Sequence, residues 1–168
     1  IPNENVEYRV ASAEQTNIAD HSLDLITVSQ ALHWFDHDAF AQEVRRVLKK
    51  AGVLAAWGYG YPEINPQVDQ LITGFSRGPL DSYWAKGREY LENQYHDIPF
   101  PFEYERHDEF YSEKQFNFHD LMGWLSSWSA YLKYVKDNDV DILASIEPSL
   151  LEAWGDPNEV KVVKFPIY

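Results

Sequence analysis

The most informative segment of this chain is residues 22–57, which read SLDLITVSQALHWFDHDAFAQEVRRVLKKAGVLAAW. Residues 22–29 are mostly apolar and rich in strand-forming residues, a pattern typical of a strand covered on both faces. Asp36 then stands at a helix N-cap position, ahead of apolar residues at helical spacing, namely Phe40, Val44, Val47 and Leu48. Two lysines and a glycine within residues 49–52 suit the end of that helix, and residues 53–57 form a second buried strand. Strand, helix and strand in this order predict a right-handed βαβ unit.

The segments on either side extend this α/β pattern. Residues 6–10 alternate apolar and polar side chains, which predicts a half-buried strand. Residues 64–75 carry apolar residues at helical spacing, and the pattern predicts an amphipathic helix that Gly78 and Pro79 end. Residues 83–102 are dense in aromatic side chains.

The C-terminal part of the chain predicts two strands and two helices. One strand is expected within residues 103–115, and a last strand over residues 160–168. Asn117 is suited to cap a helix whose apolar face carries Leu121, Trp124, Leu125, Trp128 and Leu132. A second helix carries Val140, Leu143, Ile146, Leu150, Leu151 and Trp154. Pro148 is expected to break this second helix and Gly155 to end it.

Composition and charge exclude several classes of function. The chain has 168 residues with 14 Lys and Arg against 27 Asp and Glu, a formal net charge of −13. Such a surface repels nucleic-acid phosphates and anionic membranes, and no apolar stretch approaches the length of a transmembrane helix. The absence of cysteine excludes disulfides, thiolate metal sites and cysteine nucleophiles, and fits a cytoplasmic protein.

The two ends of the chain bear on whether the sequence is complete. The first residues lack the basic and apolar regions of a signal peptide, and the chain closes on the apolar run KFPIY. We therefore expect this sequence to be part of a larger protein.

Small and polar residues follow the first two predicted strands. They lie in residues 11–14 and in residues 29–36. In open α/β sheets, ligands bind outside the carboxyl ends of the strands, and small residues there allow a close approach to the backbone. These two segments are therefore the candidate ligand site.

The same segments carry a resemblance to a known family. The motifs are Ser12-Ala13-Glu14, residues 20–36, residues 43–49, residues 52–54 and Trp57, with weaker support from residues 99–102, 124–129 and 154–155. Together they resemble the middle of a class I S-adenosylmethionine-dependent methyltransferase of the type 11 kind. The wider pattern is similar to the small-molecule subgroup that includes trans-aconitate methyltransferase-like proteins.

The resemblance implies a fold and a domain organisation. It implies an α/β, Rossmann-like methyltransferase sheet with a helical, aromatic cap and a C-terminal antiparallel strand, in a single partial domain over residues 1–168. Residues 61–102 would be the cap over the acceptor. The family's glycine-rich loop precedes its third strand, where this chain begins, and none of the eight glycines here lies in a G-x-G-x-x-G arrangement. We therefore expect the sheet to be N-terminally incomplete.

The resemblance also implies roles for individual residues around S-adenosylmethionine. The residues expected to bind the cofactor are Ser12, Ala13 and Glu14 at the adenine and Ser29 at the methionine part. The residues expected to face the transferred methyl group and a small-molecule acceptor are Gln30, His33 and Trp34. His33 is the candidate general base, since its unperturbed pKa lies near neutrality. Trp34 and Trp57 are candidate aromatic walls for the cationic sulfonium.

Two other classes of function stay open on the sequence alone. One is a non-catalytic binding module that has lost the cofactor-binding half, with pairing into a homodimer through an exposed sheet edge. The other is a hydrolase or metal enzyme built on His33, Asp36 and His37. No metal site is expected, because a cap at Asp36 places His33 outside the helix and the sequence offers no third ligand.

Overall fold

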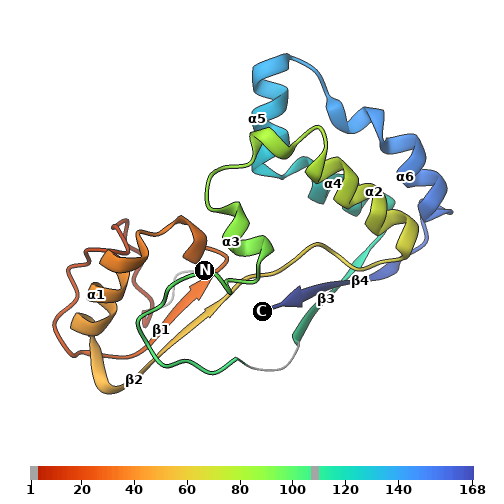
Figure 1. Cartoon of the computed structure of the whole chain (residues 1–168). Coiled ribbons are helices and arrows are strands. Elements are labelled where there is room, and N and C mark those ends of the chain that lie inside the picture. The colour runs from red at the N-terminus through yellow and green to blue at the C-terminus, as the bar shows by residue number, and fades with distance from the viewer. Residues whose placement is uncertain (1–3, 107–109) are drawn as a thin grey trace. The chain divides into compact units, whose positions relative to one another are not determined.

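The structure is a computed structural model of the whole chain, and it describes residues 4–106 and 110–168. The chain forms two compact units (Figure 1). The first consists of Ile1–Trp57 with His96–Glu105, and the second consists of Gly58–Tyr95 with Arg106–Tyr168.

The first unit contains the predicted strand, helix and strand. Its elements are β1 (Leu23–Ser29), a 3-10 turn η1 (Leu32–Trp34), α1 (His37–Val47) and β2 (Leu48–Trp57). The two strands are parallel neighbours, with Leu25 opposite Val53 and Ser29 opposite Trp57. A helix that connects two parallel strands is the βαβ arrangement that the sequence predicted.

Helix α1 begins where the sequence predicted and ends earlier. The Asp36 side chain accepts a hydrogen bond from the Ala39 N–H at 3.0 Å and caps the helix. The predicted end at residues 49–52 is wrong, because the backbone turns extended at Leu48 and residues 49–52 belong to β2. Gly52 serves the sheet instead, since a Cβ there would lie 3.0 Å from the Leu23 carbonyl oxygen. Residues 49–52 lie at an irregularity of the sheet, between the pairs Leu23–Leu48 and Leu25–Val53, and not at the end of the helix.

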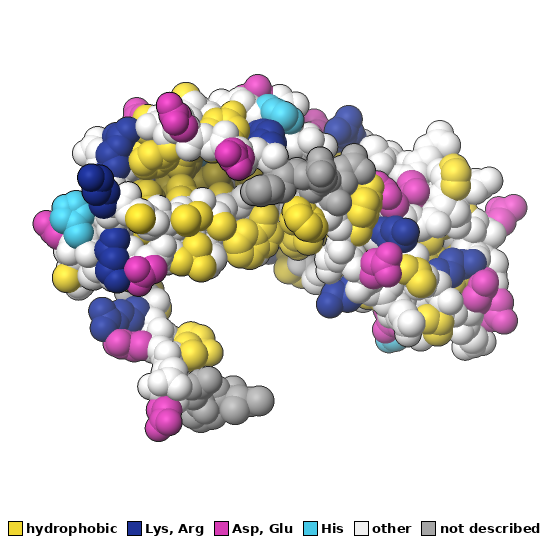
Figure 2. Space-filling view, turned by 90° about the horizontal axis from the view of Figure 1, so that it is seen from below, with side chains coloured by type: hydrophobic (Ala, Val, Ile, Leu, Met, Phe, Trp, Pro, Cys, Tyr) yellow, Lys and Arg dark blue, Asp and Glu magenta, His cyan; other side chains and the backbone are white. Residues whose placement is uncertain are grey.

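Two predictions about the first unit's sheet are wrong. Residues 6–10 form no strand, and Val6, Tyr8 and Val10 are exposed. An alternating segment becomes a strand only where a neighbouring strand bonds it, and within the described residues this sheet holds only β1 and β2. The sheet is also not covered on both faces, because Leu25 and Val53 are 55% and 57% exposed. The face of the molecule drawn in Figure 2 carries a group of hydrophobic side chains, coloured yellow.

The second unit is mostly helical. Its elements are α2 (Pro66–Arg77), η2 (Asp81–Tyr83), α3 (Arg88–Glu92), β3 (Phe110–Phe116), α4 (Phe118–Ser126), α5 (Ser129–Asn138), η3 (Ile142–Ser145), α6 (Glu147–Trp154) and β4 (Lys161–Ile167). Strands β3 and β4 pair antiparallel, with Ser112 opposite Phe165, so the predicted C-terminal antiparallel strand is confirmed. The segment after β2 also bonds to β4, since the Gly60 N–H donates to the Pro166 carbonyl at 2.9 Å.

The helices of the second unit bury one continuous apolar core. Its members are Val68, Ile72, Phe75, Leu80, Phe118, Leu121, Leu125, Ala130, Leu143, Leu150 and Trp154. The predicted helix after Asn117 has the expected cap, in which the Asn117 side chain accepts from the Asp120 N–H and the Asp120 carboxylate accepts from the Asn117 N–H. That reciprocal pair is a capping box, which satisfies two N–H groups at the start of α4.

Two helix boundaries in the second unit differ from the prediction. The apolar face from Leu121 to Leu132 does not lie on one helix, because α4 ends at Ser126 and α5 starts at Ser129. The hydroxyls of Ser126 and Ser127 donate back to helix carbonyls, a local alternative to helix continuation. The predicted helix over residues 140–154 is divided near Pro148, as expected, into η3 and α6, but the division lies before the proline. Pro148 itself is in the first turn of α6, where a proline removes no intrahelical hydrogen bond. Gly155 ends α6 at a φ of 93°, as predicted.

No helix within the residues that the structure describes has the length and apolarity required to cross a bilayer.

Candidate functional site

The first part of the candidate site is the loop that holds Ser12, Ala13 and Glu14. The Ser12 hydroxyl donates a hydrogen bond to the Glu14 carboxylate, and the Glu14 N–H donates to the Ser12 Oγ at 3.3 Å. This hydroxyl hydrogen bond is the main cause that lowers the pKa of Glu14 below its ordinary value. Glu14 is therefore an ionised hydrogen-bond acceptor at neutral pH.

Glu14 also joins this loop to the start of α1. The Asp36 N–H donates to Glu14 Oε1 at 3.2 Å, across 22 positions of the sequence. This contact brings together the two polar segments that the strand-end argument selected. The sequence did not predict that the Asp36 N–H would bond to Glu14, because every residue other than proline has a backbone N–H and the residue type does not reveal its partner.

The second part of the candidate site is the carboxyl end of β1. Ser29 ends the strand opposite Trp57, and the Gln30 N–H donates to the Trp57 carbonyl at 2.8 Å. Gln30 has a φ of 52°, a left-handed conformation that a residue other than glycine adopts at an energetic cost of about 1 kcal/mol. Strained backbone of this kind is concentrated at functional sites, and here it falls on a predicted site residue.

His33 and Trp34 lie together on the 3-10 turn that follows. Their ring centroids are 4.7 Å apart. The His33 side chain is buried at 7% exposure, whereas the Trp34 ring is 54% exposed. Trp34 therefore presents an open aromatic surface, and His33 packs behind it.

The residues of the alternative metal-enzyme hypothesis are not gathered into a metal site. Asp36 caps α1, and His37 Nε2 lies 3.1 Å from the Leu32 carbonyl oxygen. Within residues 4–106 and 110–168, no group of three or more His, Cys, Asp or Glu side chains is placed to hold a metal ion.

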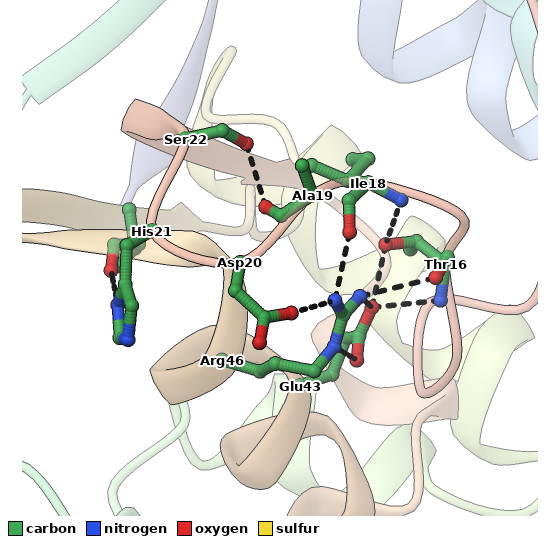
Figure 3. A network of polar contacts seen from close by, with 9 residues as sticks. Thr16, Ile18, Ala19, Asp20, His21, Ser22, Glu43 and Arg46 are labelled. Carbon is green, nitrogen blue, oxygen red and sulfur yellow. Dashed lines mark hydrogen bonds and ion pairs between the residues drawn. The ribbon is translucent and has the colours of Figure 1, made fainter.

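A partly buried ionic network holds the chain that follows the Ser12–Glu14 loop (Figure 3). The Glu43 carboxylate accepts hydrogen bonds from the Thr16 N–H at 2.7 Å and from the Arg46 guanidinium at 2.7 and 2.8 Å. Arg46 also donates to the Ile18 carbonyl at 2.7 Å and to Asp20 at 2.6 Å. The Arg46 hydrogen bonds lower the pKa of Glu43 from 4.5 to about 2. The network thus fixes residues 16–20 on α1, two residues beyond Glu14.

Sequence reasoning missed a cavity in the second unit. Its volume is about 330 Å³, and its lining starts at Tyr59, two residues after the end of β2. Arg77, Arg88 and Tyr168 contribute to its wall. The available signal was the Gly-Tyr-Gly-Tyr run at residues 58–61, where small residues stand beside hydroxyl-bearing aromatic ones.

Comparisons with known proteins show the family to which the chain belongs. Residues 1–56 match the model of a family described as a methyltransferase domain. The chain is 36% identical, over 98% of its length, to a protein of Dictyostelium discoideum named as a methyltransferase, and it covers 65% of that protein. It is also 36% identical, over 47% of its length, to a protein of Schizosaccharomyces pombe named as an uncharacterised methyltransferase, and covers 33% of it.

A solved structure extends the likeness to the fold. The chain superposes with a TM-score of 0.88 on the structure of a protein from Anaeromyxobacter dehalogenans whose title calls it a type II methyltransferase. The two are 35% identical, and the match covers 99% of this chain and 71% of the other. This chain belongs to the class I S-adenosylmethionine-dependent methyltransferase family and has its Rossmann-like α/β fold. It spans slightly less than two thirds, 65%, of the Dictyostelium relative.

Proposed function

We propose that the protein transfers a methyl group from S-adenosylmethionine to a small-molecule acceptor. The observation that carries this proposal is the hydrogen bond from the Asp36 N–H to Glu14, which joins the Ser12–Glu14 loop to the segment that follows the carboxyl end of β1. Ligands of open α/β sheets bind at such a place. Membership of the methyltransferase family supplies the reaction class.

The residues of the first unit fit part of such a cofactor. The ionised Glu14 carboxylate is suited to accept a hydrogen bond from the exocyclic amine of adenine, with Ser12 and Ala13 beside it. Ser29 is assigned to the methionine part, because it stands at the carboxyl end of β1. The open Trp34 ring is suited to attract a cationic sulfonium.

The protein has a limited chemical task in this reaction. When bound, the cofactor supplies a methyl group on a sulfonium, which is already a strong electrophile. Gln30 and Trp34 are proposed to orient the acceptor and exclude water from it. His33 is proposed to accept the acceptor's proton where that acceptor is a hydroxyl, and residues 61–102 are proposed to cover it.

We propose the class of acceptor and the cellular location of the protein from its charge and composition. A net charge of −13 opposes nucleic-acid acceptors, so we assign a small molecule. We also propose a cytoplasmic location, since the chain has no cysteine.

A second candidate function is a non-catalytic binding module. The exposure of Leu25 and Val53 on one sheet face favours it, because exposed apolar surface is typical of interaction sites. A homodimer formed through this unit belongs to the same proposal.

Binding of S-adenosylhomocysteine by the full-length protein separates the two candidates. A methyltransferase should show an increase of several degrees in melting temperature at saturating ligand, and a binding module should show none. Glu14→Gln should weaken the affinity about tenfold, because an amide loses the charge-assisted hydrogen bond. Glu152→Gln, a change on the exposed surface of α6, is the matched control and should leave the affinity unchanged.

The opposite results have clear meanings. Equal affinity in the Glu14→Gln and Glu152→Gln variants would remove Glu14 from the cofactor site. Absence of any stabilisation in the full-length protein would reject methyl transfer and leave the binding module.

A further inference from the structure

The cavity of the second unit is lined by an arginine with one unsatisfied N–H group. Arg88 lines the cavity from α3, and its side chain is 24% exposed. Its Nε is buried and has no hydrogen-bond partner within the described residues. The ion pair from this Nε to Glu92 Oε1 measures 3.5 Å, which is long for a charge-assisted hydrogen bond. An arginine in this state is rare, because buried polar groups are nearly always satisfied.

Aromatic rings hold the Arg88 guanidinium in place. Its Cζ lies 4.1 Å from the centroid of the Trp84 ring and 5.4 Å from that of Tyr61. These are cation–π distances, so the two rings attract the guanidinium and hold it at the cavity wall.

The two rings are themselves fixed by a partly buried chain of hydrogen bonds. The Trp84 Nε1–H donates to Ser76 Oγ at 3.1 Å, and Ser76 Oγ lies 2.7 Å from the Tyr61 hydroxyl. The Tyr61 hydroxyl donates to Glu92 at 3.2 Å. Arg88 is therefore positioned before any ligand arrives, which lowers the entropy that a ligand must overcome.

The charges around the cavity limit what it can accept. Arg77 and Arg88 line it together with three carboxylates, those of Glu63, Asp69 and Glu92. Arg77 Nη2 lies 3.9 Å from Glu92, so Glu92 is shared between the two arginines. A ligand with one negative charge can pair with Arg88, whereas one with two or three would be repelled by the carboxylates.

We infer that this cavity binds a small carboxylic acid with a single carboxylate, held by Arg88. The inference rests on the cavity of the second unit alone. The tyrosine side chains in the wall, including Tyr61 and Tyr168, suit a planar or aromatic body attached to that carboxylate.

The test is a binding titration with three probes of similar shape and different charge. Benzoate carries one negative charge, benzamide none and isophthalate two. They are titrated into the full-length protein without cofactor, and binding is followed by the Trp84 indole N–H signal in NMR, which a Trp84→Phe spectrum assigns. Benzoate should bind at least tenfold tighter than benzamide and tighter than isophthalate.

Variants connect this preference to one side chain. Arg88→Gln should abolish the preference for benzoate over benzamide, whereas Lys86→Gln, an exposed change outside the cavity wall, should retain it. Arg88→Lys keeps the positive charge but not the planar guanidinium, and it should weaken the binding of benzoate at least threefold. This variant replaces Arg88→Gln as the test if Arg88→Gln does not fold. Equal binding of benzoate and benzamide, or a preference unchanged in the folded variants, would overturn the inference.

The two proposals fail separately. S-adenosylhomocysteine binding is measured on the same protein sample. Loss of cofactor binding with benzoate preference intact would reject methyl transfer and keep the anion site. Cofactor binding without a benzoate preference would reject the anion site and keep methyl transfer.

Discussion

The two units of this protein are stabilised in different ways. In the second unit, α2, α4 and α6 bury residues such as Ile72, Leu121 and Trp154 in one apolar core. In the first unit, α1 buries an apolar face, but the sheet leaves Leu25 and Val53 open, and an ionic network around Glu43 fixes the adjoining loop. Apolar side chains of the same type thus contribute different amounts to the stability of the two units, because the contribution depends on how much of each side chain the fold buries.

The largest expected effect compares the same substitution in the two units. Leu121→Ala in the second unit should destabilise the protein by about 2–5 kcal/mol, because it leaves a cavity in a closed core. Leu25→Ala in the first unit should change the stability by about 0.5 kcal/mol or less, because that side chain is already exposed. Urea unfolding measures both. Similar losses in the two variants would mean that the sheet face is covered in solution.

The next effect tests the ionic network of the first unit. Glu43→Gln should destabilise the protein by about 2–3 kcal/mol at pH 7, because Arg46 and Thr16 lose an ionised partner in a buried position. Asn158→Asp, on an exposed turn of the second unit, is a control that should change stability little.

The same network predicts a dependence on pH. The folded pKa of Glu43 is about 2 against an ordinary value of 4.5, so the folded state binds its proton more weakly. The stabilisation is therefore complete above about pH 5 and is lost as the pH falls toward 2. Over that pH range, the melting temperatures of the wild-type protein and the Glu43→Gln variant should converge. A stability gap that stays constant from pH 7 to pH 3 would argue against the ionised pair.

The smallest effect compares the helix caps of the two units. Asp36→Ala at α1 and Asn117→Ala at α4 should each destabilise the protein by about 1 kcal/mol, because each removes an acceptor for a free helix N–H. The double variant should lose the sum, since the caps share no partner. A clear excess over the sum in urea unfolding would show coupling between the units.

Local features of the fold were predictable from sequence, and long-range ones were not. The caps at Asp36 and Asn117 and the stop at Gly155 were predicted because the residues that decide them lie within a few positions of one another. The early end of α1 was not, because it depends on pairing between Leu48 and Leu23. The missing strand at residues 6–10 has the same cause, since no local pattern shows whether a neighbouring strand is present.

The candidate site divides in the same way. The general rule about strand ends selected residues 29–36, which do lie at and after the end of β1. It selected Ser12–Glu14 from a strand at residues 6–10 that does not form, and it is the contact between Glu14 and Asp36 that joins this loop to residues 29–36. Arg88 was not selected, because its character comes from Tyr61 and Trp84 and from a cavity that several distant segments build. A single arginine in a sequence carries no sign of an unsatisfied N–H group.

The pairing of residues 58–63 with β4 has a consequence for the order of folding. The Gly60 N–H bonds to the Pro166 carbonyl, and the Glu63 N–H bonds to the Lys164 carbonyl at 2.7 Å, across about a hundred intervening residues. Contacts between such distant positions form slowly, because a long loop must close before they contribute. During synthesis on a ribosome, α2 and α4 can emerge and collapse while this sheet still lacks its central strand. The wall of the arginine cavity that includes Pro166 and Tyr168 is then among the last parts of the second unit to be completed.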